Sequence, residues 1–503
     1  MRSHRRISSV AVATAAVIAL ALTGCTGGGN TDGDAAAPTD LSVGLIASPA
    51  SLDFTTTAGG AIPQALLYNV YEGLVKINNT GDIEPLLASD YTVSEDGLVY
   101  NFTLHEGVTF SNGSPFTAET VKFSLERVAD NWTANGPGYL SPISAITVVS
   151  DTEVQITLST PSNSWLFNMA GPVGTMFSPD GVDALATEPV GTGPYTVTAF
   201  SPGTSLDLQL RDDYWGDAPY MTEVELRYFA DANAQSNALL SGDIDVVTQL
   251  SQYQLVSQFE SNDDYKVQEG SSTGEVTLTM NNQSAAFADV RVRQAVMFAV
   301  DRQAIVDTVN SGYGTVLGQM AAPTDPWYDP TLVNLYPFDP ERAEALLAEA
   351  GVSDLTVALK VPNLPYAVAA AQVVQSQLAD VGITVETSTL EFPAVWLDEV
   401  FTKHDYDMSI ISHNEPRDIT LFAAPTYYAG YNNPDVMSLF AQADAADPET
   451  SIDLMKEATT VMAEEAAADW LYLIPVVSVA DADLTGVPLN APTLSLDLST
   501  IAR

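Results

Sequence analysis

A single cysteine, Cys25, occurs among the 503 residues of the chain. It follows an N-terminal segment in which arginines precede an apolar run over residues 10–22, and this order of charge and hydrophobicity is typical of an export signal. Many exported proteins are cross-linked by disulfides, but one cysteine cannot form an intrachain bond. Whatever folds beyond Cys25 therefore folds without an intrachain disulfide.

The apolar run is shorter than the ~20 residues that a permanent membrane-spanning helix needs, so we predict that residues 1–24 are a cleaved signal peptide. Residues 22–25 (LTGC) resemble the lipobox of bacterial lipoproteins. That resemblance implies that Cys25 carries the lipid and begins the mature chain; the alternative is a chance cysteine. Residues 25–40 are rich in Gly, Ala, Thr and Asp, which predicts a flexible tether. We expect the lipid to be the only contact with the membrane, on its extracellular side.

The length of the chain indicates how many lobes it forms, and its net charge indicates which partners it avoids. The chain beyond Cys25 is longer than one hydrophobic core usually covers, so at least two lobes are expected. The formal net charge of the full chain is −46, and a polyanion of this size should avoid nucleic acid and anionic lipid head groups. We therefore expect no nucleic-acid partner. The acidity by itself does not indicate a cationic ligand, because it also serves solubility.

Strand-like and helix-like patterns alternate without a fixed repeat, which predicts a mixed α/β class. Strands with alternating polar and apolar residues are predicted at residues 98–104, 153–158, 205–210, 223–228, 275–280 and 383–386. Helices are predicted at residues 117–128, 289–309 and 340–350. The last of these has Asp339 as its N-cap, Pro340 at its first position and Gly351 beyond its end, all favoured at those positions.

Several sequence blocks resemble the large solute-binding proteins of peptide and nickel ABC importers, known as extracellular solute-binding protein family 5. The signature region comprises residues 71–75 (YEGLV), 85–88 (PLLA), 91–110 (YTVSEDGLVYNFTLHEGVTF) and 112–121 (NGSPFTAETV). Blocks in family order follow at residues 189–195 (PVGTGPY), 214–215 (YW), 238–245 (ALLSGDID), 280–282 (MNN), 290–295 (VRVRQA), 299–302 (AVDR), 338–340 (FDP) and 378–383 (LADVGI). One departure is His105, where the family usually has Arg or Lys.

The resemblance implies a two-lobed periplasmic-binding-protein clamshell. The first lobe would hold residues 41–283 and 471–503, with a subdomain inserted at about 59–185, and the second lobe would hold residues 284–470. Such a protein closes on its ligand by a hinge motion that the ligand stabilises. The resemblance further implies capture of a small solute, most simply an oligo- or dipeptide, and delivery to ABC permease subunits by a monomer.

The family's specificity segment corresponds to residues 411–422 (ISHNEPRDITLF), after a strand predicted at 406–412. Peptide-binding members carry an aspartate there that pairs with the ligand's ammonium, and Glu415 and Asp418 match its acids by position. The usual Trp and Asp-Pro pair are absent. The predicted ligand-binding residues are His413, Asn414, Glu415, Arg417 and Asp418, with the aromatic residues Trp396 and Tyr431. Arg417 could bind a carboxylate or neutralise Asp418, His413 could ligate a metal chelate, and for each residue a purely structural role is the alternative.

An enzyme is not expected. None of the histidines of the chain lies in a His-Glu-x-x-His, Gly-x-Ser-x-Gly or cysteine-containing motif. We therefore expect no catalytic residues, no cofactor and no resident metal. Besides a peptide, the open ligand alternatives are a nickel or metal chelate, an opine or an oligosaccharide. A different class of function, surface adhesion or signalling on the same fold, stays open as well.

Overall fold

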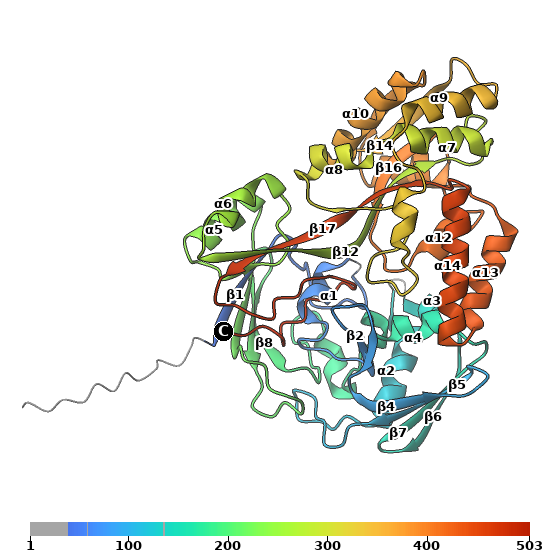
Figure 1. Cartoon of the computed structure of the whole chain (residues 1–503). Helices are drawn as coiled ribbons and strands as arrows, with labels where there is room; N and C mark the ends of the chain where they lie inside the picture. Colours follow the sequence, from blue (N-terminus) through green and yellow to red (C-terminus); the bar gives the residue numbers. More distant parts are fainter. Residues whose placement is uncertain (1–38, 58, 134–135) are drawn as a thin grey trace, which may run out of the picture. The chain divides into compact units, whose positions relative to one another are not determined.

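Two long antiparallel strands, β12 (Tyr265–Met280) and β17 (Asp469–Asp481), run side by side through the molecule (Figure 1). They belong to a computed structural model that describes residues 39–57, 59–133 and 136–503. The pairing is interrupted between Ser271 and Glu275, where the register shifts. The interruption leaves residues 272–274 out of the regular ladder, as in a β-bulge.

The strands β12 and β17 connect two groups of parallel strands within one sheet of order β15-β14-β16-β12-β17-β11-β1-β10-β9-β8, with β13 beside β17. On one side, β1 is parallel to both β10 and β11, and on the other side β14 is parallel to both β15 and β16. The bounds are β1 Asp40–Leu45, β8 Tyr195–Ser201, β9 Ser205–Leu210, β10 Glu223–Tyr228, β11 Val246–Val247, β13 Thr315–Val316, β14 Thr356–Pro362, β15 Thr384–Leu390 and β16 Met408–His413.

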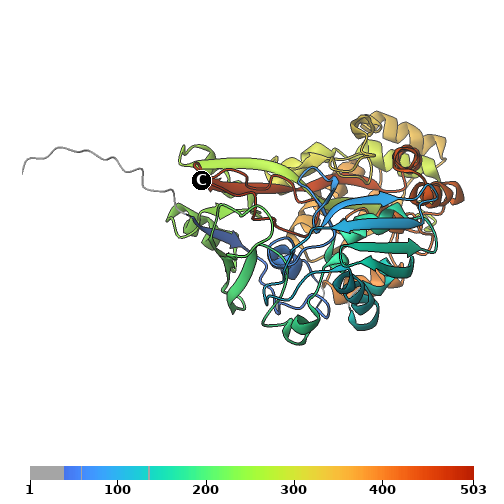
Figure 2. The same ribbon diagram turned by 90° about the horizontal axis from the view of Figure 1, so that it is seen from below.

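The other strands form a four-stranded antiparallel sheet of order β4-β5-β7-β6 and a pair β2-β3 (Figure 2). Their bounds are β2 Val75–Ile77, β3 Ile83–Pro85, β4 Ala88–Val93, β5 Val99–Leu104, β6 Ile143–Ser150 and β7 Glu153–Leu158. The turn between β4 and β5 holds Gly97 at φ +68°, a conformation that glycine adopts readily. Strands β4 and β5 thus form an antiparallel hairpin.

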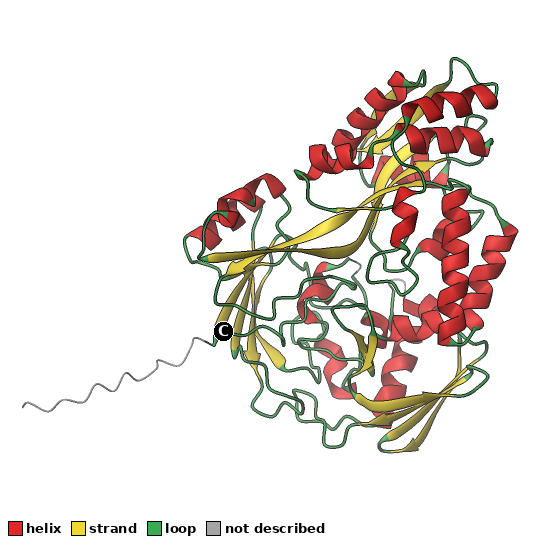
Figure 3. Cartoon of the chain, in the orientation of Figure 1, coloured by secondary structure: helices red, strands yellow, loops and turns green. Residues whose placement is uncertain are grey.

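Helices lie among these strands, so the predicted mixed α/β class is confirmed (Figure 3). Their bounds are α1 Ala61–Leu66, α2 Ala118–Asn131, α3 Gly136–Leu140, α4 Asn163–Met169, α5 Ala232–Leu240, α6 Ser257–Glu260, α7 Val290–Ala299, α8 Arg302–Asn310, α9 Pro340–Glu349, α10 Pro365–Asp380, α11 Ala394–Trp396, α12 Ile419–Phe422, α13 Pro434–Ala445 and α14 Pro448–Glu464.

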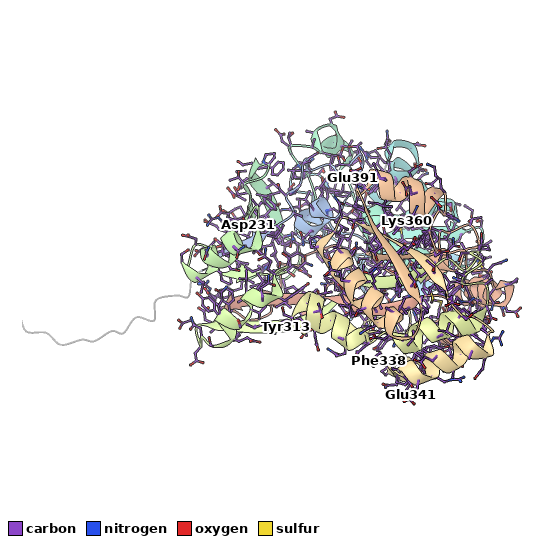
Figure 4. All side chains as sticks on the ribbon, turned by 90° about the horizontal axis from the view of Figure 1, so that it is seen from above. Asp231, Tyr313, Phe338, Glu341, Lys360 and Glu391 are labelled. Carbon is purple, nitrogen blue, oxygen red and sulfur yellow. The ribbon has the colours of Figure 1, made fainter. Side chains whose placement is uncertain are left out.

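The helix caps follow the sequence closely in one case and overturn a prediction in another. Asp339 caps α9 by accepting a hydrogen bond from the Arg342 backbone N–H, and the exposed residues Phe338 and Glu341 mark the start of this helix in Figure 4. The single helix predicted at residues 289–309 is wrong. Val300 is extended, and Asp301 starts a new helix by accepting a hydrogen bond from the Ala304 backbone N–H, as an N-cap residue does.

The hydrophobic core is divided into clusters that follow the groups of strands. One large cluster combines residues between 41 and 228 with residues between 480 and 501. A second combines residues between 276 and 385 with residues between 408 and 472, and a third lies around α13 and α14. Segments far apart in the sequence thus share a core, and β12 and β17 run from one cluster to another.

The predicted signal peptide, Cys25 and all but the last two residues of the predicted tether lie outside the described residues. The structure begins at Thr39, and β1 begins at Asp40. Within residues 39–57, 59–133 and 136–503, no helix has the combination of length and apolar character that crossing a membrane requires.

Candidate functional site

A groove of about 440 Å³ opens where the parallel strands of both groups end. The groove is lined by the last residue of β1 and the two residues after it (45–47), by residues 249–251 and 253 after β11, and by Asn414 after β16. In open α/β sheets, ligands bind in the crevice outside the carboxyl ends of the parallel strands. The volume lies in the range of small-molecule sites, so the groove is the candidate ligand site.

The groove carries no charged side chain among its described lining residues. The lining residues are Leu45, Ile46, Ala47, Gly60, Ala61, Gln64, Gln249, Leu250, Ser251, Tyr253, Ser272, Thr273, Gly274, Asn414, Ile474, Pro475, Val476, Ala491, Thr493, Leu494 and Ser495. Apolar walls with a few amide and hydroxyl groups bind a neutral body and orient it through hydrogen bonds. In a chain of net charge −46, the absence of charge from this lining is a distinctive property.

A second, much smaller cavity adjoins the groove at Thr273, which lines both. It measures about 10 Å³, which is room for one water-sized group. Its walls come from separate parts of the chain: Ile77, Gly81, Phe167, Thr273, Glu275, Ala322, Thr324, Asp325, Pro416, Arg417 and Pro492. We call it the charged cavity, because Glu275, Asp325 and Arg417 face it.

Arg417 bridges the walls of the charged cavity. Its Nε lies 3.2 Å from Asp325 Oδ1, and its guanidinium carbon lies 3.8 Å from the centre of the Phe167 ring and 4.8 Å from that of Trp327. Burial raises the pKa of Asp325, and the neighbouring Arg417 opposes this rise. The guanidinium is thus paired and stacked. The partner that the sequence suggested, Asp418, is not its ion-pair partner.

Glu275 is the most unusual group beside the cavity. It is 5% exposed, and its Oε2 atom is buried without a hydrogen-bond partner among the described residues. Burial raises its pKa well above the ordinary value, and the acids Asp418, Asp325 and Glu415 raise it further. An unpaired buried carboxyl is expensive to ionise.

His413 lies inside a hydrogen-bonded network. Its Nε2 lies 2.9 Å from the Tyr428 hydroxyl, and its Nδ1 lies 3.3 Å from both Asp418 Oδ2 and the Tyr427 hydroxyl. The Tyr428 hydroxyl also lies 2.9 Å from Thr279 Oγ1. Burial raises the pKa of Asp418, while His413 lowers it, and Asp418 Oδ1 has no partner among the described residues. Both imidazole nitrogens are therefore engaged within the protein.

The remaining predicted residues lie in different surroundings. Glu415 is exposed. Trp396 is buried in a cluster with Val400 and Tyr406, and its Nε1 donates to Ser409 Oγ. Tyr431 is buried near α13 and donates from its hydroxyl to Glu465. Neither Trp396 nor Tyr431 is among the described residues that line the groove or the charged cavity.

Sequence reasoning missed Glu275, Asp325 and Phe167, which all line the charged cavity. Glu275 begins a strand that was predicted from its alternation, so its position was known but its burial was not. Asp325 lies 92 residues from its partner Arg417, and no local pattern connects them. In the part of the chain that the structure describes, no group of three or more His, Cys, Asp or Glu residues is arranged to hold a metal ion.

Comparison with known proteins gives consistent results. The family described as bacterial extracellular solute-binding proteins, family 5 middle, matches residues 82–435. The glutathione-binding protein GsiB of Salmonella paratyphi A is 28% identical over 477 residues, covering 86% of this chain and 90% of that protein.

Two solved structures are similar in fold. The periplasmic binding protein DppA from Helicobacter pylori, in complex with peptide STSA, has a TM-score of 0.74 at 23% identity, covering 92% of this chain and 97% of that one. NikA from Brucella suis, in complex with Fe(III)-EDTA, has a TM-score of 0.80 at 24% identity, covering 92% and 99%. The predicted similarity to two-lobed periplasmic binding proteins is confirmed.

Proposed function

Because the chain belongs to the bacterial extracellular solute-binding proteins of family 5, we propose that it captures a small peptide-like solute in the uncharged groove and delivers it to the permease of an ABC importer. The observation that carries the proposal is the groove itself. Its lining offers apolar surface together with side-chain amides and hydroxyls, which suits a neutral peptide body. A binding role without catalysis accords with the relatives, which are named as binding proteins.

The interrupted ladder at residues 272–274 supports a peptide-like ligand. Thr273 donates from its hydroxyl to the Asn414 backbone carbonyl, and Ser412 Oγ donates to Asn414 Oδ1. These bonds hold the loop after β16 against the bulge of β12, at the rim of the groove. Backbone groups freed from a ladder can pair with an extended ligand backbone, as in strand addition.

Closure would use β12 and β17 as the two crossings between lobes. We place the first lobe at residues 41–283 and 471–503, with an inserted subdomain at about 59–185, and the second at 284–470. Across this division, Asn163 Nδ2 donates to the Ala443 and Ala446 carbonyls at 2.9 and 2.8 Å. Such bonds are present only when the lobes meet, so they stabilise the closed state together with the ligand.

The ligand differs in our proposal from that of the curated relative. Among the described residues that line the groove and the charged cavity, Arg417 is the one cation, and Asp325 already neutralises it. Glutathione carries two carboxylates, which would meet acids here. We therefore expect glutathione to bind poorly and a neutral or cationic peptide to bind well.

Mass spectrometry of the ligand tests the proposal directly. The full-length Cys25→Ser variant is purified from the soluble fraction, denatured to release its ligand, and then titrated with the identified compound in a calorimeter. Short peptides are the expected result. A released sugar, opine or metal chelate, or the absence of binding by any identified peptide, would overturn the peptide assignment.

Anchoring is a separate part of the proposal. Cys25 would carry the lipid, and residues 25–40 would tether the folded lobes to the extracellular side of the membrane. The Cys25→Ser variant should move from the membrane fraction to the soluble fraction and lose incorporation of a palmitate analogue. Because Cys25 is the single cysteine, the substitution breaks no disulfide. Unchanged membrane association of the variant would contradict the anchor.

A further inference from the structure

We propose that Glu275 forms a subsite for a primary ammonium group of the ligand, placed at the charged cavity beyond the inner end of the groove. This inference rests on the proposed function, because the ligand body has to occupy the groove. Thr273 lines both spaces. A ligand in the groove can therefore extend one end past Thr273 toward Glu275.

The charges around Glu275 leave it without a counter-ion. The ionisable groups that face it from the neighbouring strand and loops are His413, Glu415, Arg417, Asp418 and Asp325. Arg417 is paired with Asp325, and His413 lies beside Asp418. No cation among the described residues forms an ion pair with Glu275. The site lacks one positive charge, which the ligand would supply.

The size of the charged cavity favours an ammonium over a metal ion. A volume of about 10 Å³ accommodates one water-sized group, and an ammonium group has about this size. Divalent calcium needs 6–8 oxygen ligands, and magnesium usually keeps several waters. The described residues offer no such set of ligands around Glu275.

Glu275 is distinct from the acids of the loop after β16. It belongs to β12, where it pairs in register with His413 of β16, and its side chain is almost fully buried. Glu415 on the loop is exposed. An acid on the strand is held more rigidly than one on the loop, so it fixes where the ammonium must lie.

Binding would move one proton. Burial and the neighbouring acids favour the protonated carboxyl of Glu275 in the unliganded protein. When an ammonium enters, the carboxyl releases its proton to solvent, and the carboxylate accepts hydrogen bonds from the ammonium. Ligand binding should therefore release up to about one proton and strengthen as the pH rises.

The test uses random tripeptides without cysteine or lysine, so that the N-terminus carries the single primary ammonium, prepared in free, N-acetylated and C-amidated forms. Capture by the full-length Cys25→Ser protein is read by native mass spectrometry. Loss of the ammonium should reduce capture at least about tenfold, as expected for a buried charge-assisted contact. Amidation should leave capture within about threefold, because no unpaired cation lines the described part of the site.

A captured tripeptide is then titrated into the parent, Glu275→Gln and Glu269→Gln proteins, in two buffers of different ionisation enthalpy. Glu269 lies on the same strand, is exposed, and bonds to the Gly314 N–H, so it serves as the matched control. Glu275→Gln should weaken binding about tenfold or more and abolish proton release. Glu269→Gln should keep both the affinity and the proton release of the parent protein.

Each outcome has one interpretation. Equal capture of N-acetylated peptides, or unchanged affinity and proton release in Glu275→Gln, overturns the ammonium subsite and leaves the peptide receptor in place. Capture of no peptide in any form overturns both. A melting temperature of Glu275→Gln at or above that of the parent protein excludes misfolding as the cause of weaker binding.

Discussion

Two arginine–aspartate pairs are withdrawn from solvent, and their neighbours differ. Arg302 of α8 and Asp469 of β17 lie 2.6 Å apart with side chains 5% and 0% exposed, and Arg302 Nη1 donates to the Tyr336 carbonyl. The pair of Arg417 and Asp325 lies beside the charged cavity. The first pair joins a helix to a central strand within the protein core, whereas the second faces the space in which a ligand would bind.

The difference shows that burial of a charge does not by itself indicate function. Burial raises the pKa of Asp469, as it raises that of Asp325, and each arginine opposes the rise. The two pairs differ in whether an aromatic ring from a distant segment stacks on the arginine. Arg417 stacks on Phe167, which belongs to another hydrophobic cluster, so its surroundings change if the two halves separate. Among the described residues, no aromatic ring stacks on Arg302.

The largest effect is expected at the core pair. Arg302→Leu leaves Asp469 buried and unpaired, which should lower the free energy of unfolding by about 3–5 kcal/mol. Urea unfolding measures the loss. The double variant with Asp469→Leu removes both charges and should recover most of the stability. Equal destabilisation of the single and double variants would show that packing, and not the unpaired charge, dominates.

A smaller loss of stability, joined to a loss of affinity, is expected at the cavity pair. Arg417→Ala removes the partner of Asp325 and the stacking on Phe167, which should cost about 1–3 kcal/mol. In the proposed two-lobe closure the stacking forms only when the lobes meet, so part of that cost should appear as weaker peptide binding in calorimetry. Arg417→Lys keeps the charge without the planar stacking group. Its stability and peptide affinity should therefore lie between those of the parent protein and those of Arg417→Ala. Unchanged affinity in Arg417→Ala would place this pair with the core pair.

The two pairs also show how far the sequence could be interpreted. Arg302 ends a block that resembles the family at residues 299–302, and Arg417 lies in the segment predicted to bind ligand. The family resemblance, the mixed α/β class and most strand positions were confirmed. The partners Asp469 and Asp325 come from distant segments, and only the folded chain brings them to their arginines.

Glu275 illustrates the same limit at the site. The alternation of residues 275–280 predicted a strand, with Glu275, Thr277 and Thr279 on one face, and the usual inference places a polar face toward solvent. In the structure both faces of this part of β12 are buried, because Val276 and Leu278 pack in a hydrophobic cluster on one face and Thr279 contacts the Tyr428 hydroxyl on the other. Alternation gives the period of a strand but does not show what covers each face.

The pH dependence of stability tests whether Glu275 is buried without a counter-ion. Its pKa in the folded protein is raised above the ordinary value of 4.5, so its contribution favours folding at low pH and is lost as the pH rises through the raised pKa. Glu275→Gln should therefore be more stable than the parent protein at pH 8, and the two proteins should differ little near pH 4. Urea unfolding at both pH values measures the gap. A gap that does not change with pH would contradict this assignment.

The smallest effect is expected at the Asn163 side chain, an uncharged group of α4 that bonds to the end of α13. Asn163→Ala removes the two hydrogen bonds to the last turn and end of α13, each contributing about 0.5–1.5 kcal/mol. Because α4 packs in one hydrophobic cluster and α13 in another, we expect the loss mainly in peptide affinity, as a several-fold rise in Kd that corresponds to about 1 kcal/mol. Thermal unfolding of the unliganded protein should change little. Asn168→Ala, at the other end of α4, serves as the control and should leave the Kd unchanged. A drop in melting temperature without a change in Kd would mean that these bonds persist without ligand and do not report closure.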